Sequence, residues 1–219
     1  MISVVIPTLN AERLLPRCFD SLIAGAVRGV IREVIVGDGG SDDHTLMIAD
    51  AAGAHIVHSR KERGVQLADG AALAKSDWLL FLHPETSLEQ GWEVEAESFI
   101  GQAIMERPRA AVFRFALEDF GGEARRAEAK AAVRSRLFAL PYGDQGLLIP
   151  KRLYQKIGGY RALADMEDAD IVRRVGRRRL VGLRSRAINV ARPNPGTLRG
   201  FALTLLHTLR IPSGVLAKL

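Results

Sequence analysis

The chain has 219 residues, of which 47% are apolar and 26% are charged, so it is long and apolar enough for one large α/β domain and is not a disordered chain. The single cysteine, Cys18, excludes a disulfide framework and a multi-cysteine metal cluster. The formal charge of +6 suits an anionic partner. Because no aromatic residues alternate with the basic clusters, we expect no nucleic-acid partner.

The ends of the chain bear on localisation and on domain organisation. The first residues lack the basic start and long apolar stretch of a signal peptide, and no run of about 18 apolar residues occurs, so we expect a cytoplasmic protein. We predict a single domain over residues 1–219, in which residues 196–219 form a C-terminal amphipathic appendage. This appendage packs on the core, contacts a second copy in a homodimer, or docks peripherally on the inner face of a membrane.

Strands and helices alternate along the first part of the chain. Short apolar runs predict buried strands, at residues 2–6, 33–36, 55–57 and 78–82. Apolar residues three and four apart predict helices between them, and this order predicts a mostly parallel central sheet with helices on both faces. The later elements that we predict are helices at 91–107, 122–138, 166–179 and 197–211 and strands at 111–117, 147–149, 180–183 and 187–190.

Polar turns follow directly on three of the predicted strands, at residues 7–12, 38–43 and 83–86. Ligands of parallel α/β sheets bind beyond the carboxyl ends of the strands, so we expect the chemistry at these turns. A glycine-rich turn also occurs in dinucleotide-binding and methyl-donor enzymes. The first strand ends in Pro7-Thr8-Leu9-Asn10, however, and lacks the spaced glycines that seat a pyrophosphate in those enzymes.

The strand-end motifs, taken in order, resemble glycosyltransferase family 2, the nucleotide-sugar transferases with the GT-A fold. The resemblance covers residues 2 to about 180 and rests on motifs at residues 5–10, 37–43, 63–64, 81–85 and 167–168. Residues 143–146 and the form of the fourth strand are similar to a small bacterial branch that is often labelled arsenosugar-type biosynthetic glycosyltransferases.

The resemblance implies a nucleotide diphosphate sugar as donor, a UDP-sugar above all. Asp38 then contacts the edge of the base, Gly40 lets the backbone approach closely, and Arg63 suits two phosphate oxygens. The alternatives are a helix cap at residues 38–43, a first-turn acid at Glu12 and an exposed loop charge at Arg63. The donor-binding residues that the resemblance implies are Pro7, Thr8, Asn10, Glu12, Asp38, Gly40 and Arg63.

Residues 83–85 depart from the family's pattern. Family members usually carry Asp-x-Asp there, which holds a divalent cation on the donor's two phosphates, whereas this chain has His83-Pro84-Glu85. One imidazole and one carboxylate can hold a cation more weakly, and Mn²⁺ rather than Mg²⁺, because Mg²⁺ prefers oxygen ligands. We therefore predict His83 and Glu85 as metal ligands; the alternative for His83 is a structural role.

Two further pairs of polar residues are candidates for binding or activating the acceptor. Glu167 and Asp168 match the family's acidic pair, in which the second acid deprotonates the attacking hydroxyl, and we expect burial to raise the pKa of Asp168 toward the working range. The alternative is that these acids merely begin a helix. Asp144 and Gln145 orient the acceptor, close over the donor or are ordinary turn residues.

The resemblance as a whole implies an inverting, hexosyltransferase-like enzyme that moves one sugar to an unknown hydroxyl acceptor. Residues 173–178 lack the Gln-x-x-Arg-Trp string of processive relatives, which favours single-sugar transfer. The alternative is a nucleotide-sugar-binding protein that has lost catalysis through the change at residues 83–85.

Overall fold

The computed structural model describes residues 1–105, 108–118, 145–163 and 166–190. The predicted helices at 122–138 and 197–211, the appendage at 196–219 and the candidate residue Asp144 lie outside the described residues.

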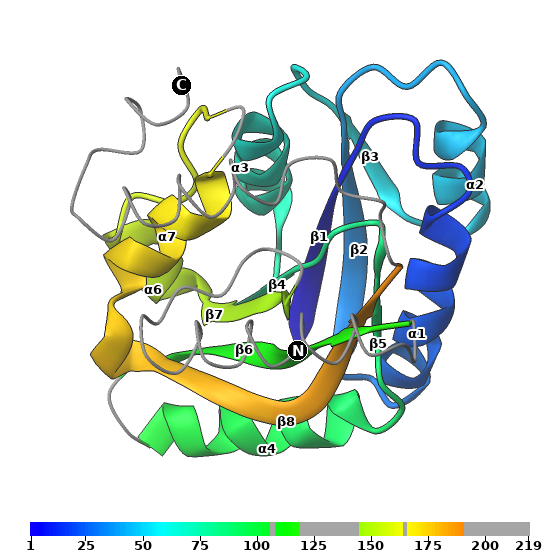
Figure 1. The fold of residues 1–219 in the computed structure, drawn as a ribbon. Coiled ribbons are helices and arrows are strands. Elements are labelled where there is room, and N and C mark those ends of the chain that lie inside the picture. The colour runs from blue at the N-terminus through cyan, green and yellow to red at the C-terminus, as the bar shows by residue number, and fades with distance from the viewer. Residues whose placement is uncertain (106–107, 119–144, 164–165, 191–219) are drawn as a thin grey trace.

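One sheet of eight strands forms the centre of the described structure (Figure 1). Its spatial order is β3-β2-β1-β4-β7-β6-β8-β5. The β1–β2, β1–β4, β2–β3 and β6–β8 pairs are parallel and the other pairs are antiparallel, which confirms the mostly parallel α/β sheet. The strands are β1 (Ile2–Thr8), β2 (Ile31–Asp38), β3 (His55–His58), β4 (Trp78–Phe81), β5 (Thr86–Leu88), β6 (Ala110–Leu117), β7 (Leu147–Pro150) and β8 (Leu180–Asn189).

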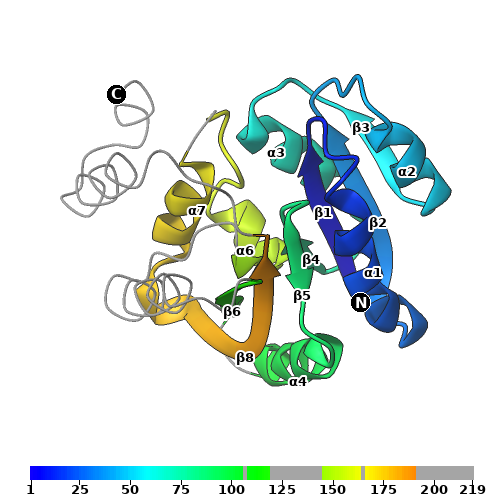
Figure 2. The same ribbon diagram turned by 45° about the vertical axis from the view of Figure 1, so that its right-hand side comes forward.

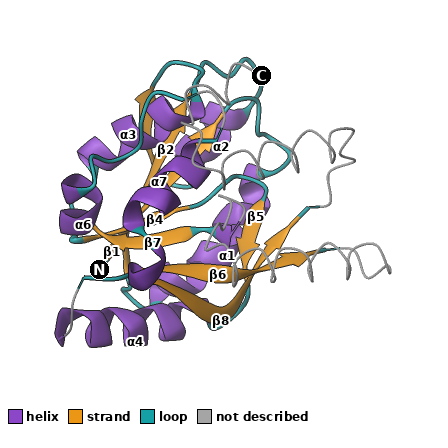
Figure 3. Ribbon diagram, turned by 60° about the vertical axis from the view of Figure 1, so that its left-hand side comes forward, coloured by secondary structure: helices purple, strands orange, loops and turns teal. Residues whose placement is uncertain are grey.

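Helices cover both faces of the sheet (Figures 2 and 3). Successive side chains of a strand point to opposite faces, so Val4 of β1 packs into one core and Val5 into the other. The helices on the Val4 face are α1 (Leu15–Val27), α2 (Thr45–Ala51) and α4 (Trp92–Met105). Those on the Val5 face are α3 (Arg63–Leu73), α6 (Lys151–Lys156) and α7 (Glu167–Val175).

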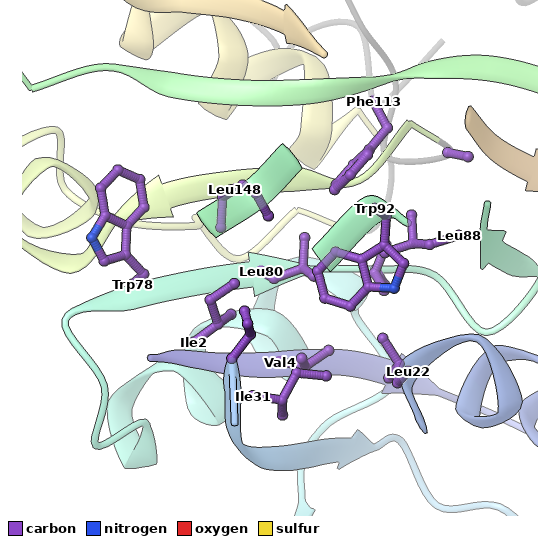
Figure 4. Packing of buried hydrophobic residues seen from close by; sticks show 14 of the residues in the cluster. Ile2, Val4, Leu22, Ile31, Trp78, Leu80, Leu88, Trp92, Phe113 and Leu148 are labelled. Carbon is purple, nitrogen blue, oxygen red and sulfur yellow. The ribbon is translucent and has the colours of Figure 1, made fainter. Parts of the chain in front are cut away.

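The core on the Val4 face is built around Trp92 of α4, which is fully buried (Figure 4). Its ring packs edge-on against Phe113 of β6, and its indole N–H donates a hydrogen bond to the carbonyl of Ser21 in α1 at 2.9 Å. A Cβ at Gly25 would lie 2.8 Å from the Trp92 ring, so the glycine lets α1 approach α4. Each large side chain buried here contributes about 1.5–3 kcal/mol.

The structure corrects the prediction beyond residue 166. The helix predicted through Arg179 ends at Val175, because Gly176 takes a φ of 82°, in the left-handed region; a 3-10 turn, η2 (Arg177–Arg179), follows it. The two strands predicted at 180–183 and 187–190 are one strand, β8. Its register slips opposite β6 near Arg184, and the Glu95 carboxylate of α4 accepts the backbone N–H groups of Arg184 and Ser185 at 2.8 Å.

Two short elements were not predicted at all, β5 and α6. We expected a turn over residues 83–86, but β5 begins at Thr86 and pairs with β8 at the far end of the sheet. In the described part of the chain, no helix combines the length and the apolar character that a membrane crossing requires.

The strand register brings the predicted turns to one edge. Val5 of β1 lies opposite Phe81 of β4, and Thr8 lies opposite Asp38 of β2. Since β1 has a parallel neighbour on each side, the turns after β1, β2 and β4 leave the sheet side by side at the edge where such sheets bind ligands.

Candidate active site

The turn after β2 is held together by Asp38, whose side chain is 0% exposed. One of its carboxylate oxygens accepts the hydroxyls of Thr8 (2.9 Å) and Ser41 (2.5 Å), and the other accepts the backbone N–H groups of Gly40 (2.9 Å) and Ser41 (2.8 Å). Burial alone would raise the pKa of Asp38, but these donors hold the pKa below its usual value. The carboxylate is thus saturated by its own turn.

The turns after β1 and β2 also bind each other. Asn10, which has a φ of 53°, donates its backbone N–H to the Ser41 hydroxyl and accepts the backbone N–H of Asp42, both at 2.9 Å. Glu12 lies 2.9 Å from the ring nitrogen of His44 and accepts the His44 backbone N–H at 3.2 Å. Pro7 pairs in register with Gly37. These two turns form a single platform.

Gln66 of α3 is a residue of this region that the sequence analysis missed. Its buried amide donates to the carbonyl oxygen of Thr8 at 3.2 Å, and a Cβ on Gly39 would overlap that amide. The signal was present: Gln66 is a polar residue amid the apolar face of the predicted helix at 65–74. Gln66 therefore ties the platform to the first turn of α3.

The same helical turn reaches α7 on its other side. Arg63 Nη1 lies 3.2 Å from Oε1 of Glu167, which is 1% exposed. Gly64 donates its backbone N–H to the carbonyl of Leu163 at 3.2 Å, and a Cβ on Gly64 would overlap the carbonyl oxygen of Arg161. The glycine thus allows the approach that brings Arg63 to the acidic pair.

The acidic pair meets the end of β4 at His83. Nε2 of the buried His83 lies 3.3 Å from Oδ2 of Asp168, and its Nδ1 lies 3.9 Å from Oε1 of Glu85. In spite of the short distance to Asp168, Nε2 makes no well-aligned hydrogen bond. Tyr160 donates its hydroxyl to the other Asp168 oxygen, Oδ1, at 3.0 Å.

The pKa values of the two acids are driven apart. Burial and the adjacent charge of Asp168 raise the pKa of Glu167 to about 7, and Arg63 offsets only part of this rise. Burial alone would raise the pKa of Asp168 too, but His83 lowers it to about 2. The expectation that burial raises the pKa of Asp168 is therefore wrong: Glu167 is the raised acid. Burial alone would lower the pKa of His83, but the adjacent Asp168 carboxylate raises it above its usual value.

Three of these residues have the arrangement of a cation site. Ligand atoms of His83, Glu167 and Asp168 all lie within 4.8 Å of one another. Neighbouring ligands of an octahedral ion lie about 3 Å apart when the bonds are about 2.1 Å long, so the 3.3 Å between His83 and Asp168 fits one ion. Nε2 of the buried His83 makes no well-aligned hydrogen bond and faces Asp168, so a neutral imidazole offers its lone pair to an ion at this place.

The structure thus brings together most of the predicted residues and separates others. One cluster is formed by residues of α3, of α7 and of the turn after β4, namely Arg63, His83, Glu85, Glu167 and Asp168. The platform around Asp38 lies at the same edge on the other side of β1. Gln145 is buried at the entry to β7. Glu85, predicted as a metal ligand, is not in the group of three that includes His83.

The fold is GT-A-like. The chain is similar to glucosyl-3-phosphoglycerate synthase from Mycobacterium tuberculosis in complex with Mg²⁺ and UDP (TM-score 0.67, 22% identity, covering 97% of this chain and 80% of that one). It is also similar to residues 1–349 of S. aureus TarS in complex with UDP-GlcNAc (TM-score 0.68, 14% identity, covering 95% and 66%). At these identities the likeness concerns the fold.

The sequence comparisons find a family match in the first part of the chain. Residues 3–92, which are less than half of the chain, match the family described as "Glycosyl transferase family 2". A "PGL/p-HBAD biosynthesis glycosyltransferase" of Mycobacterium tuberculosis is 41% identical over 110 residues, which are 47% of this chain and 42% of that relative. The match thus spans less than half of the relative's length, and the relative's name does not point to the arsenosugar-type branch that we expected.

Proposed function

We propose that the protein is a glycosyltransferase that moves one sugar, of the hexosyl type, from a UDP-sugar to a hydroxyl acceptor with inversion. One observation carries the proposal. His83 and Glu85 at the end of β4 meet Glu167 and Asp168, which follow much later in the chain, within reach of Arg63. This cluster lies at the same edge as the Asp38 platform, within a chain that has a GT-A-like fold.

The platform is the proposed nucleoside site. Support comes from its place in the family-matched segment and from solved neighbours whose names include UDP or UDP-GlcNAc. Because Asp38 is fully buried and accepts four hydrogen bonds, we propose that it acts by shaping residues 38–41, rather than by the direct base contact that the resemblance implies. Thr8 and Asn10 take part as members of the same platform.

The divalent cation, Mn²⁺ in our proposal, neutralises the donor's diphosphate when it is bound. His83 would hold it through Nε2, and Mn²⁺ is favoured because it accepts an imidazole more readily than Mg²⁺ does. Glu85, the other predicted ligand, lies 3.9 Å from Nδ1 of the same ring and outside the group of three. The Asp168 oxygen that faces His83 also belongs to the cation-capable group. Oδ2 of Asp168 could therefore act as a metal ligand or as the base, and the experiment below separates these two roles.

We assign the base role to Asp168. Its Oδ2 takes the proton of the acceptor hydroxyl while that oxygen attacks the anomeric carbon, and the bond from this carbon to the diphosphate oxygen breaks, its electron pair leaving with the nucleotide. Because the attack and the departure take place on opposite faces, the configuration inverts. Arg63, with its side chain 40% exposed, offers its guanidinium to the phosphate oxygens.

Asp168→Asn tests this assignment, with the exposed Asp50→Asn of α2 as the matched control. Release of UDP from a panel of UDP-sugars measures turnover, and calorimetry with Mn²⁺ and UDP measures binding. We expect turnover to fall about 1,000-fold while both Kd values stay within about threefold. Loss of Mn²⁺ binding would instead make Asp168 a ligand, and unchanged turnover would remove it from the chemistry.

The second candidate is a binding protein without turnover, and the replacement of the usual first acid by His83 favours it. A thermal-shift panel of nucleotide diphosphates and nucleotide sugars, with and without Mn²⁺, separates the two functions when it is combined with the turnover assay. A ligand at a hundred times its Kd adds about 2.7 kcal/mol of stability. Shifts without any turnover would favour the binding protein, and a flat panel would contradict both functions.

The acceptor class follows from neither the fold nor the site. Relatives that match part of the chain are named for PGL/p-HBAD biosynthesis, so we propose acceptors of that kind as the first to be assayed. The arsenosugar-type branch stays a prediction from residues 143–146, of which residues 143–144 lie outside the described structure.

A further inference from the structure

Tyr160 makes a set of contacts that no role described above requires. It is buried, with 6% of its surface exposed, and its hydroxyl donates a hydrogen bond to Oδ1 of Asp168 at 3.0 Å. Its backbone N–H donates to the hydroxyl of Tyr154 at 3.0 Å. Its ring packs edge-on against Phe81, with the ring centres 4.9 Å apart and the planes at 79°.

These contacts tie Asp168 to the strand that carries His83. Phe81 is the last residue of β4 and lies two residues before His83, so the Tyr160 ring packs on the strand end and its hydroxyl reaches the start of α7. The turn that presents Tyr160 is also restricted. Gly159 has a φ of 58°, and a Cβ there would lie 3.0 Å from the Tyr154 ring, so another residue would be strained at this position.

The two oxygens of Asp168 are therefore not equivalent. Oδ1 accepts the Tyr160 hydroxyl, whereas Oδ2 faces the Nε2 of His83 without a well-aligned hydrogen bond. A carboxylate with one oxygen held by a buried donor cannot rotate freely about its last bond, and a misplacement of about 1 Å at a reacting group can lower a rate about 100-fold.

We propose that Tyr160 is the positioning residue of Asp168: its hydroxyl holds Oδ1, so that Oδ2 is the oxygen that receives the acceptor's proton. The inference rests on the proposed function, since it needs Asp168 to act as the base. Tyr160 itself touches neither donor nor acceptor in this account, and its effect reaches the reaction through Asp168.

The test is Tyr160→Phe, which keeps the ring against Phe81 and removes only the hydroxyl. Tyr154→Phe is the matched control, because it also removes one buried hydroxyl and one hydrogen bond from the same aromatic group. We expect both variants to lower Tm by a similar amount, but only Tyr160→Phe to lower kcat about tenfold, with the KM for the UDP-sugar and the Kd of Mn²⁺–UDP unchanged within twofold.

A double-mutant cycle separates positioning from a general loss of structure. In the Asp168→Asn background the hydroxyl has no base to hold, so Tyr160→Phe should have no further effect on the residual kcat. An unchanged kcat in the single variant, a rise in KM with kcat intact, or an additive loss in the double variant would overturn the inference. Absence of turnover in the wild-type protein would instead overturn the proposed function, and the inference with it.

Discussion

Two neighbouring regions at one edge of the sheet are built in opposite ways. In the Asp38 platform, every carboxylate oxygen of Asp38 has two donors, and the turns after β1 and β2 exchange hydrogen bonds through Asn10. In the cluster between β4 and α7, the buried Nε2 of His83 lacks a hydrogen bond and the pKa of Glu167 is raised to about 7.

This contrast indicates that the Asp38 platform has a structural role and that the cluster between β4 and α7 is the reactive part of the site. A satisfied network is rigid and gains little from a ligand that would have to displace its hydrogen bonds. Buried titratable groups with shifted pKa values, and buried polar atoms without a hydrogen bond, are typical of sites that bind a ligand or transfer a proton. We therefore expect substitutions in the platform to act on stability and those in the cluster to act on turnover.

After Asp168→Asn, the largest loss of turnover should come from Arg63, the cation of the cluster. Arg63→Gln removes the charge that faces Glu167 and, in our proposal, the donor's phosphates, so kcat/KM should fall about 100-fold. The control is Arg60→Gln, which changes an exposed arginine three residues before Arg63 and should have an effect below about twofold. Equal losses in both variants would show that only the overall charge matters.

Gly64→Ala should damage the junction between the two regions. The added methyl group would overlap the carbonyl oxygen of Arg161, so backbone must move and the unfolding free energy should fall by about 3 kcal/mol in urea denaturation. Gly101→Ala of α4, which has open space around its Cβ, should instead raise stability by about 0.5–1 kcal/mol. A tolerated Gly64→Ala would contradict the close approach of α3 to the segment before α7.

Asp38→Asn tests the platform directly. An amide cannot accept four hydrogen bonds, so at least one buried donor loses its partner and the unfolding free energy should fall by about 2 kcal/mol. The exposed Asp42→Asn of the same turn should change it by less than about 0.5 kcal/mol. If Asp38→Asn leaves stability unchanged and abolishes only UDP binding, the result would support a direct contact between Asp38 and the base.

The smallest effect concerns the pH dependence of stability. Because the pKa of Glu167 rises from its ordinary value of 4.5 to about 7 on folding, its contribution is complete below about pH 4.5 and is lost as pH rises through 7. In metal-free protein, Glu167→Gln should therefore gain stability over the wild type between pH 5 and pH 8, by an amount on the order of 1 kcal/mol. Parallel stability curves would mean that the pKa is not raised.

The parts of the molecule that were predictable from sequence depend on local patterns. The apolar runs of β1, β2 and β4 each end in a polar turn, so both the strands and their shared edge follow from the sequence. The continuity of β8 was not predictable. The backbone N–H groups in its irregular middle donate hydrogen bonds to Glu95, which lies far away in the sequence, in α4.

In the candidate site, too, local motifs were predictable from the sequence and contacts between distant segments were not. Asp168 was found by its motif, but the direction of its pKa shift depends on His83, which is far away in the chain and adjacent in space. Tyr160 looked like an ordinary residue of a glycine turn, and only the packing on Phe81 aims its hydroxyl at Asp168. Contacts between distant segments decide the chemistry here, and a single sequence does not encode them as a pattern.

The central claim is that the platform and the cluster bind two ends of one nucleotide sugar. A crystal structure of the protein with UDP and Mn²⁺ tests it most directly. We expect the uracil on residues 38–41, the diphosphate beside Arg63 and the Mn²⁺ on the imidazole of His83. A nucleotide bound away from either region, or a Mn²⁺ that leaves His83 untouched, would contradict the account.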